Sequence, residues 1–383
     1  MNRSNLLVAA LLFLFLACGT RQTKEEENKS QDMSATYVFL LGTYTDLPEQ
    51  GIHLAGFSPE NGFEVLATAS EPENPSFVIA NKNQNLIFTV EETSGAEGGK
   101  VSGFQLAKNS ISKINTVSAA GNSPCYLSLD PSEKFLVVGN YSQGNFSVIP
   151  VANDGHLKPA IQVVQHEGSS VNPGRQKQPH VHSTVFHPKD GKLFVADLGT
   201  DEVVVYNFDS QKEKPLDVNP HFRLQVAPGA GPRHMVFNEN GDRLYLVHEI
   251  TAEIGVYQYN EGTLKHLETH SLLQEGFEGT VGAAEVRLSP DGKHVYVSNR
   301  GDANEIIGFA VAPDGGLKHI QTLSSEGEAP RNFNITPDGT YVLVGNQNSN
   351  TLLAFERDAR SGLLSATGHQ LDIHKPVYIN FLP

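Results

Sequence analysis

One sequence unit recurs seven times in this chain, and its regular spacing is the strongest constraint on the fold. Each copy begins at an anchor residue, usually a proline, that precedes a short apolar strand: Pro75, Pro124, Val181, Pro232, Ala283, Pro330 and Pro376. Successive anchors lie 49, 57, 51, 51, 47 and 46 residues apart. Periods of this length are typical of solenoids and propellers, in which each repeat packs against its neighbours.

Each repeat predicts a β-hairpin followed by a further strand. Segments such as LSLDPSEKFLVVGN (127–140) and FNITPDGTYVLVGN (333–346) alternate apolar residues on both sides of a turn. Third strands rich in β-branched and aromatic residues follow, as in EVVVYNFD (202–209) and EIIGFAV (305–311). One such sheet cannot bury two faces alone, so the copies are expected to pack face to face around an axis.

The two ends of the repeat region predict how the ring closes. The last repeat stops after one strand, VYINFLP (377–383), while residues 37–41 and 52–57 supply strands without an anchor of their own. Joining these ends in one blade would remove the exposed strand edges of an open ring. The sequence therefore predicts an all-β fold, a seven-bladed β-propeller whose last blade is closed by an N-terminal strand. A β-helix or two separate β domains are the alternatives.

Residues 1–18 differ from the repeats and predict an export signal. Arg3 supplies a positive charge, residues 6–16 form an apolar core, and Ala17 precedes Cys18. The apolar core is too short for a membrane span but suits a signal peptide. The small residue before the cysteine resembles a bacterial lipoprotein signal, so we expect Cys18 to be lipidated after cleavage.

The polar, unpatterned residues 19–35 predict a disordered tether between this signal and a propeller over residues 36–383. We therefore expect an extracytoplasmic protein that contacts a bacterial membrane only through its N-terminal lipid.

Composition limits the partners of the chain. The 28 basic and 43 acidic side chains give a formal net charge of −15, which argues against nucleic-acid binding. Cys125 is the only cysteine beyond Cys18, so the propeller has no pair for an intrachain disulfide. His180 and His182 could contribute two metal ligands, but the sequence places no third ligand. We expect neither a metal nor a cofactor.

Two positions in each repeat are predicted to face one mouth of the central channel. The first directly follows the anchor, and the second lies 17 residues beyond the anchor, where the hairpin returns. A structural core position would carry a small or apolar residue, as at Leu198, Ala284 and Val377. Ionisable or amide groups occupy other positions in these two rings, and they are the functional candidates: His182, Arg233, Arg331, Glu92, Glu249, Arg300 and Gln347.

Each candidate also has a structural interpretation. Arg233 could merely hydrogen-bond a neighbouring loop, Glu249 could serve only as an ion-pair partner, and His182 could be a satisfied structural histidine. Arg331 and Gln347 suit substrate contacts or loop anchoring better than they suit chemistry.

At these positions the chain resembles the seven-bladed lactonase family of bacterial propeller-type 6-phosphogluconolactonases and fungal carboxy-cis,cis-muconate cyclases. The resemblance covers residues 37–383. Its motifs are Pro179-His180-Val181-His182 with Asp197-Leu198-Gly199, Gly231-Pro232-Arg233-His234, Ala284-Glu285-Val286-Arg287 with Ser298-Asn299-Arg300-Gly301, and Pro330-Arg331 with Asn346-Gln347. The resemblance implies a catalytic set of His182, Arg233, Glu249 and Arg300. The further polar residues are candidate substrate contacts: Arg331, Gln347, His180, His234 and Glu92.

The implied reaction is the opening of a sugar-acid lactone by water, as in a 6-phosphogluconolactonase. Such a hydrolase needs a base to activate water and cations at the developing oxyanion. Glu249 or His182 can serve as the base, while Arg233 and Arg300 would bind a substrate anion and polarise the carbonyl. The Gly-x-Ser-x-Gly motif of serine hydrolases does not occur. Ring closure of the muconate-cyclase type stays open, as does a non-catalytic propeller that binds a glycan, an anion or a protein.

Overall fold

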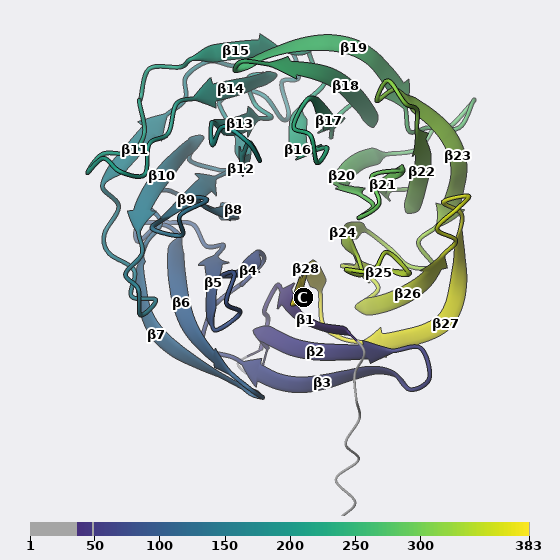
Figure 1. Ribbon diagram of the computed structural model, residues 1–383, viewed down its shortest axis with the longest axis horizontal. Helices are drawn as coiled ribbons and strands as arrows, with labels where there is room; N and C mark the ends of the chain where they lie inside the picture. The colour runs from purple at the N-terminus through teal and green to yellow at the C-terminus, as the bar shows by residue number, and fades with distance from the viewer. Residues whose placement is uncertain (1–36, 48–49, 383) are drawn as a thin grey trace, which may run out of the picture. The chain divides into compact units, whose positions relative to one another are not determined.

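The computed structural model describes residues 37–47 and 50–382, and every helix or strand assigned there is a β-strand. The strands form seven four-stranded sheets, each of them antiparallel. Figure 1 shows these sheets as blades around one axis, with one strand of each blade innermost. Each innermost strand begins at an anchor residue or within three residues of one. The predicted seven-bladed propeller is confirmed.

Six blades are continuous in sequence. From the axis outward their strands are β4 (Val78–Ala80), β5 (Leu86–Glu91), β6 (Lys100–Ala107) and β7 (Ser110–Ser118); β8 (Pro124–Leu129), β9 (Phe135–Asn140), β10 (Asn145–Pro150) and β11 (Gln162–Gln165); β12 (Val181–Phe186), β13 (Leu193–Asp197), β14 (Glu202–Tyr206) and β15 (Phe222–Gln225); β16 (Pro232–Phe237), β17 (Arg243–His248), β18 (Glu253–Asn260) and β19 (Thr263–Ser271); β20 (Val281–Leu288), β21 (His294–Gly301), β22 (Glu305–Val311) and β23 (Leu317–Ser324); and β24 (Pro330–Ile335), β25 (Tyr341–Asn346), β26 (Thr351–Arg357) and β27 (Leu364–Asp372).

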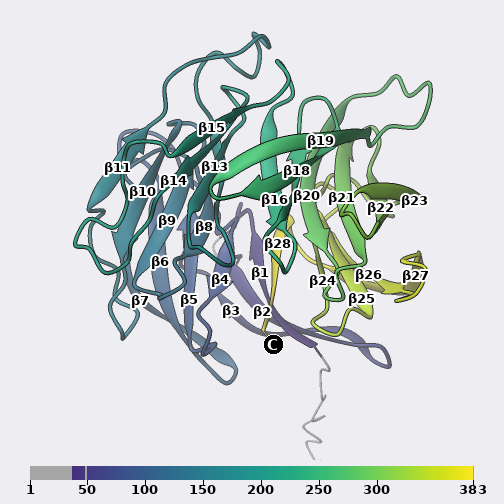
Figure 2. The same cartoon turned by 45° about the horizontal axis from the view of Figure 1, so that its top comes forward.

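The seventh blade joins the two ends of the propeller. Its strands are β28 (Pro376–Leu382), β1 (Tyr37–Thr43), β2 (Ile52–Ser58) and β3 (Gly62–Ala69). β28 pairs antiparallel with β1, and Phe39 lies opposite Phe381. Figure 2 shows β28 beside β1. The predicted closure is confirmed, although β3 was not identified from the sequence, because this outer strand leaves most of its side chains partly exposed.

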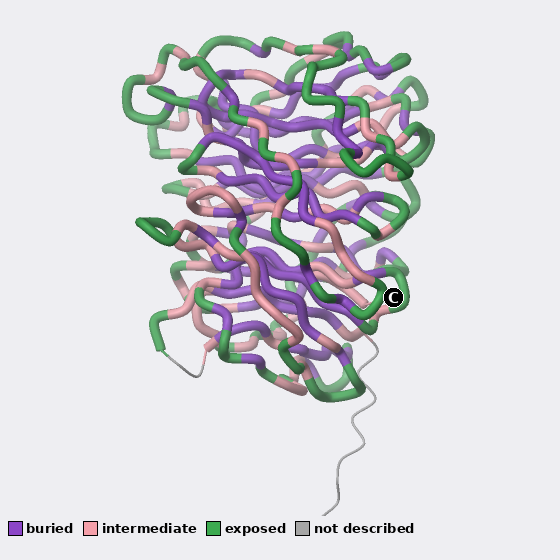
Figure 3. Tube along the Cα trace, turned by 90° about the vertical axis from the view of Figure 1, so that its left-hand side faces the viewer, coloured by how far each residue is buried: buried purple, intermediate pink, exposed green. Residues whose placement is uncertain are grey.

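Apolar side chains between neighbouring blades form the core. In one such cluster Tyr245 and Val247 of β17 pack with Val295 and Val297 of β21, and all four are buried. Figure 3 shows buried segments running along the strands and exposed segments in many of the connections. Each blade therefore depends on its neighbours for burial of its faces.

A shared hydrogen bond explains the constant 17-residue spacing. In five repeats, the backbone N–H of the residue 17 past the anchor donates to the carbonyl directly before the anchor. The Glu249 N–H, for example, donates to Gly231 O at 2.7 Å. In the repeat of Ala283 the two strands are longer, so Arg300 pairs with Gly282 inside the ladder. The second ring of candidates therefore lies beside the anchors, at one end of the axis.

A β-bulge at the anchor aims the first ring of side chains. In β12 the register passes from Val181–Asp197 to Ser183–Ala196, so His182 is an extra residue without a partner in the ladder. The same irregularity occurs after the anchors in β8, β16, β20 and β24. Bulges redirect side chains and are common beside active sites.

Candidate active site

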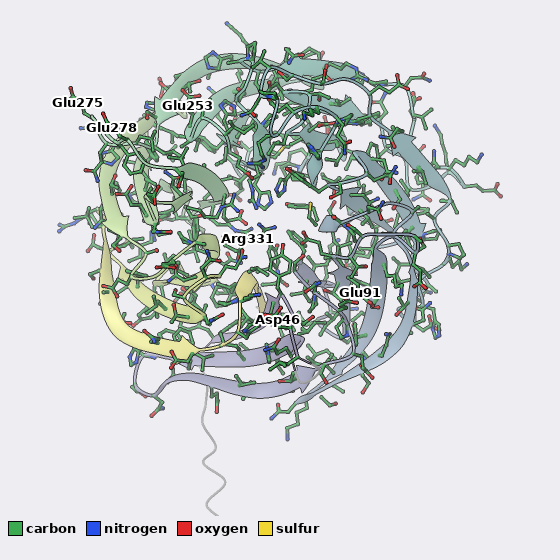
Figure 4. The ribbon with its side chains drawn as sticks, turned by 180° about the vertical axis from the view of Figure 1, so that it is seen from behind. Asp46, Glu91, Glu253, Glu275, Glu278 and Arg331 are labelled. Atoms are coloured by element: carbon green, nitrogen blue, oxygen red, sulfur yellow. The ribbon has the colours of Figure 1, made fainter. Side chains whose placement is uncertain are left out.

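The two rings of side chains meet in one cavity at the anchor end of the axis. This cavity has a volume of about 340 Å³, and every blade contributes to its lining: Tyr44, Glu92, Cys125, Tyr141, Arg175, His182, Glu249, Arg300 and Arg331. Arg331 lies at the inner end of β24 beside the axis, whereas Glu253, Glu275 and Glu278 lie far from it (Figure 4). Five of the seven functional candidates from the two predicted rings thus line one cavity together: His182, Glu249, Arg300, Arg331 and Glu92.

Glu249, which directly follows β17, is the centre of the charge network. Its Oε1 accepts a hydrogen bond from Arg175 Nη2 at 2.6 Å, and its Oε2 accepts one from Arg233 Nε at 2.8 Å. Arg300 Nη2 lies 3.2 Å from the same Oε2, and His182 Nε2 lies 3.7 Å from it. A buried carboxylate with three cationic partners is well compensated.

These cations decide the ionisation of the carboxyl group. Burial alone would raise the pKa of Glu249, but the surrounding arginines, Arg300 and Arg233 above all, hold this pKa well below the usual 4.5. Glu249 is therefore an anion at neutral pH. The same stabilisation makes its carboxylate a weak proton acceptor.

His182 is neutral at neutral pH for the complementary reason. Burial and the positive charge of Arg233 lower the pKa of His182 well below 6.5. Its Nδ1 lies 3.8 Å from the Sγ of Cys125. Its ring and that of Tyr141 form a T-shaped pair with their centroids 5.2 Å apart. The Nε2 atom is on the side of Glu249. An uncharged imidazole therefore stands next to an ionised carboxylate in the cavity.

Arg233 and Arg300 occupy different levels of the site. Arg233 is 1 % exposed and does not line the cavity, and its Nη1 donates to Ala284 O at 2.6 Å. Arg300 lines the cavity and donates from Nε to Gly282 O at 2.8 Å. Burial lowers the pKa of Arg300 to about 10, so it is still a cation at neutral pH. Only Arg300 of this pair faces the space that a substrate would fill.

A second set of charged side chains, Arg331 and Glu92, lines the cavity around Tyr44 of the closing blade. The guanidinium of Arg331 lies over the ring of Tyr44, 5.5 Å from its centroid. The Tyr44 hydroxyl donates to Glu92 Oε2 at 2.9 Å, and Ser76 also hydrogen-bonds this oxygen. Arg331 and Glu92 therefore extend the polar lining on the side opposite Glu249.

Besides Arg233, three sequence candidates lie outside the cavity lining. His180 stacks on Tyr141, with its Nδ1 3.0 Å from the Tyr141 carbonyl oxygen. His234 lies deeper along the axis, with its Nδ1 3.2 Å from Glu285 Oε2. Gln347 is half-buried. The structure does not bring these three to the cavity wall.

Sequence reasoning missed Arg175, Tyr44 and Tyr141. Arg175 lies in the loop between β11 and β12, within the longest spacing between anchors, 57 residues, and that extra length was the available signal. Tyr141 occupies the second ring, but phenols were not counted among its ionisable groups. Tyr44 follows β1, which has no anchor, so the repeat could not point to it.

The predicted signal sequence, the lipidation of Cys18 and the tether over residues 19–35 lie outside the described residues. Within residues 37–47 and 50–382, no helix is long and apolar enough to cross a membrane. In the same residues, no group of three histidine, cysteine, aspartate or glutamate side chains is placed to hold a metal ion.

Comparison with known proteins identifies the family. Residues 38–381 match the family described as "Lactonase, 7-bladed beta-propeller". The 6-phosphogluconolactonase of Formosa agariphila is 31% identical, over 87% of this chain and 96% of its own length. The 6-phosphogluconolactonase of Bacillus subtilis is 30% identical, over 90% of this chain and 98% of its own length. The periplasmic gluconolactonase of Pseudomonas aeruginosa is 36% identical, with a TM-score of 0.86 over 91% of this chain and 99% of its own. The chain therefore belongs to the lactonase family of seven-bladed β-propellers.

Proposed function

We propose that this protein is a lactone hydrolase that opens an anionic sugar-acid lactone, in the manner of a 6-phosphogluconolactonase. The observation that carries the proposal is the neutral His182 beside the ionised Glu249 in a cavity lined by arginines. The 6-phosphogluconolactonases and the gluconolactonase among its relatives support lactones as the substrate class.

In this mechanism a water molecule is held between His182 and Glu249. The water oxygen attacks the lactone carbonyl carbon while His182 Nε2 accepts the proton. Glu249 orients the water and stabilises the imidazolium that forms, because its anion lies 3.7 Å from Nε2. Collapse of the tetrahedral intermediate breaks the ring C–O bond, and the His182 imidazolium returns its proton to the ring oxygen, which becomes a hydroxyl group. The new carboxylic acid then loses its proton to solvent.

Arg300 is the cation that suits the developing oxyanion. It reaches the cavity from the end of β21, and its backbone hydrogen bond to Gly282 fixes the guanidinium before substrate arrives. Arg233 has a different role because it is buried beneath the cavity and is bonded to Glu249 and Ala284. It holds the Glu249 carboxylate in place without touching the substrate.

Charge favours an anionic substrate. Three arginines line the cavity against two glutamates, and the buried Arg233 adds a further cation below. This local excess of positive charge contrasts with the formal net charge of −15 of the whole chain. Arginine binds phosphate and carboxylate groups through two parallel hydrogen bonds.

The proposed location is outside the cytoplasm. The signal-like residues 1–18 support it, and the similar Pseudomonas enzyme is periplasmic. The lipid at Cys18 would then be the only contact with the membrane. Fractionation of the native host should place the protein with the membranes, and mass spectrometry should show acyl mass on Cys18. An intact N-terminus in the soluble cytoplasmic fraction would contradict this location.

A panel of lactones tests the proposed activity. Proton release at constant pH is recorded for phosphorylated, carboxylated and neutral sugar lactones, with spontaneous hydrolysis subtracted. We expect catalysed hydrolysis of at least one anionic lactone. Hydrolysis of none of them above the spontaneous rate would contradict the proposal.

The pH dependence follows from the pKa of His182. The imidazole must be unprotonated to accept a proton. Because its pKa is lowered, the fall of kcat/KM on the acidic side of the pH profile is expected at a lower pH than for an ordinary histidine. We expect kcat/KM to stay constant as the pH falls to 6.5 and to decline only well below that value. An acid limb centred at pH 6.5 or higher would show that a base with an unshifted imidazole pKa is at work.

A further inference from the structure

Arg175 differs from the other arginines around Glu249. Its side chain is 44% exposed, whereas those of Arg300 and Arg233 are 17% and 1% exposed. Arg300 and Arg233 each also donate to a backbone carbonyl. Arg175 instead makes both of its side-chain hydrogen bonds from one nitrogen, Nη2, to Glu249 at 2.6 Å and to Tyr141 at 3.1 Å. Arg175 is therefore the least constrained cation of the network.

The loop beneath Arg175 is firmly attached. The next residue, Gln176, is fully buried, and its Nε2 donates to Leu198 O at 2.9 Å and to Asp201 Oδ1 at 2.8 Å. Asn172 Oδ1 accepts hydrogen bonds from the backbone of the same loop, including the Arg175 N–H at 3.1 Å. The backbone that carries Arg175 is thus fixed, and the freedom lies in its long side chain.

The two oxygens of Glu249 are not equivalent. Oε2 lies 2.8 Å from Arg233 Nε and 3.2 Å from Arg300 Nη2. Oε1 is the atom that Arg175 contacts. Movement of Arg175 away from the carboxylate would free Oε1, while Oε2 would keep two cationic partners and the buried charge would remain compensated.

We propose that Arg175 is the specificity residue of the site and that it exchanges partners when substrate binds. With the site empty, its guanidinium covers Glu249 Oε1; when a lactone enters, the guanidinium turns to the phosphate or carboxylate group of that lactone. An anionic lactone is therefore bound more tightly than a neutral one, while Glu249 Oε2 stays beside His182 and Arg300 for either substrate. This inference rests on the proposed lactonase function.

The test compares Arg175→Gln with Arg223→Gln, a matched control. Arg223 is 48% exposed, makes a single 2.7 Å ion pair with Glu202, and lies on the outermost strand β15, away from the cavity. The substrates are 6-phosphogluconolactone, a glucarolactone with a free carboxylate, and neutral gluconolactone. We expect Arg175→Gln to raise KM at least tenfold for an anionic lactone and to change kcat/KM for gluconolactone less than threefold. Arg223→Gln should change neither.

The three lactones distinguish the possible roles of Arg175. A rise in KM confined to the phosphorylated lactone identifies phosphate as the partner of Arg175, and a rise for both anionic lactones identifies anions in general. An equal loss for gluconolactone would overturn the inference, because Arg175 would then only position Glu249. Unchanged KM for all three would overturn it as well.

Binding without turnover distinguishes this inference from the proposed function. Calorimetry with 6-phosphogluconate and with gluconate requires no reaction. We expect Arg175→Gln to weaken binding of 6-phosphogluconate at least tenfold and to leave gluconate binding within threefold. If the unsubstituted protein hydrolyses no lactone but shows this difference, the proposed function fails and the role of Arg175 stands. If the difference is absent, the role of Arg175 fails.

Discussion

Replacing Glu249 with glutamine is expected to lower lactone turnover by about 100-fold or more and to destabilise the fold as well. Glutamine keeps the size of the side chain but loses the charge that orients water and stabilises the imidazolium. The same change leaves Arg233, which is 1 % exposed, without its anionic partner. Breaking a buried ion pair from one side costs about 3–5 kcal/mol. Turnover by proton release and the midpoint of urea unfolding measure the two effects.

A double variant separates these two roles of Glu249. Glu249→Gln combined with Arg233→Met removes both buried charges, so we expect the urea midpoint to recover much of its loss. Turnover should remain low, because no anion is left beside His182. If the double variant regains turnover together with stability, Glu249 serves the fold and takes no part in the reaction.

Replacing His182 with alanine is expected to lower kcat by about 100- to 10,000-fold, the usual range for removal of a general base. Binding of the hydrolysis product should change far less, since the arginines that bind its anionic group remain. His266→Ala is the control, because His266 is exposed on β19 and hydrogen-bonds Thr269. The urea midpoint is measured alongside to confirm that the variant is folded.

The opposite pattern would exchange the roles of the two residues. If His182→Ala retains turnover while the Glu249→Gln/Arg233→Met variant loses it, the carboxylate is the base. The pKa values of Glu249 and His182 are both lowered in the empty site, so the turnover of these variants decides which group is the base.

The repeat was enough to predict the architecture and much of the site. Blade number and closure follow from the anchors and the truncated last copy, because each repeat must bury its faces against the next. The fixed 17-residue spacing placed Glu249 and Arg300 near His182, since backbone pairing with the residue before the anchor holds both of them beside the anchors. Periodicity therefore carries positional information about side chains as well as about strands.

What the repeat does not contain could not be predicted from it. Arg175 comes from a loop of irregular length, so no spacing rule placed it. Arg233 and Arg300 had the same predicted role, but Arg233 is 1 % exposed and does not line the cavity, whereas Arg300 does. The ionisation of Glu249 depends on burial and cations acting in opposite directions, and only three-dimensional distances decide between them.

The larger cavity at the other end of the axis provides a competing location. It measures about 440 Å³, lies at the turns that follow β4 and β8, and is lined in part by Ile79, Leu129 and Phe381. Its charged lining residues are Lys82, Asp130 and Glu133, so acidic groups outnumber basic ones there, whereas three arginines face two glutamates in the anchor-end cavity. It suits an anionic sugar acid less well than the anchor-end cavity.

A crystal structure with bound 6-phosphogluconate tests the central claim most directly. We expect the product in the anchor-end cavity, with its carboxylate within hydrogen-bonding distance of Arg300 and close to His182 Nε2, and with its phosphate on Arg175 or Arg331. Product bound in the cavity beside Leu129 and Phe381, or product at the anchor end with its carboxylate turned away from His182, would contradict the account.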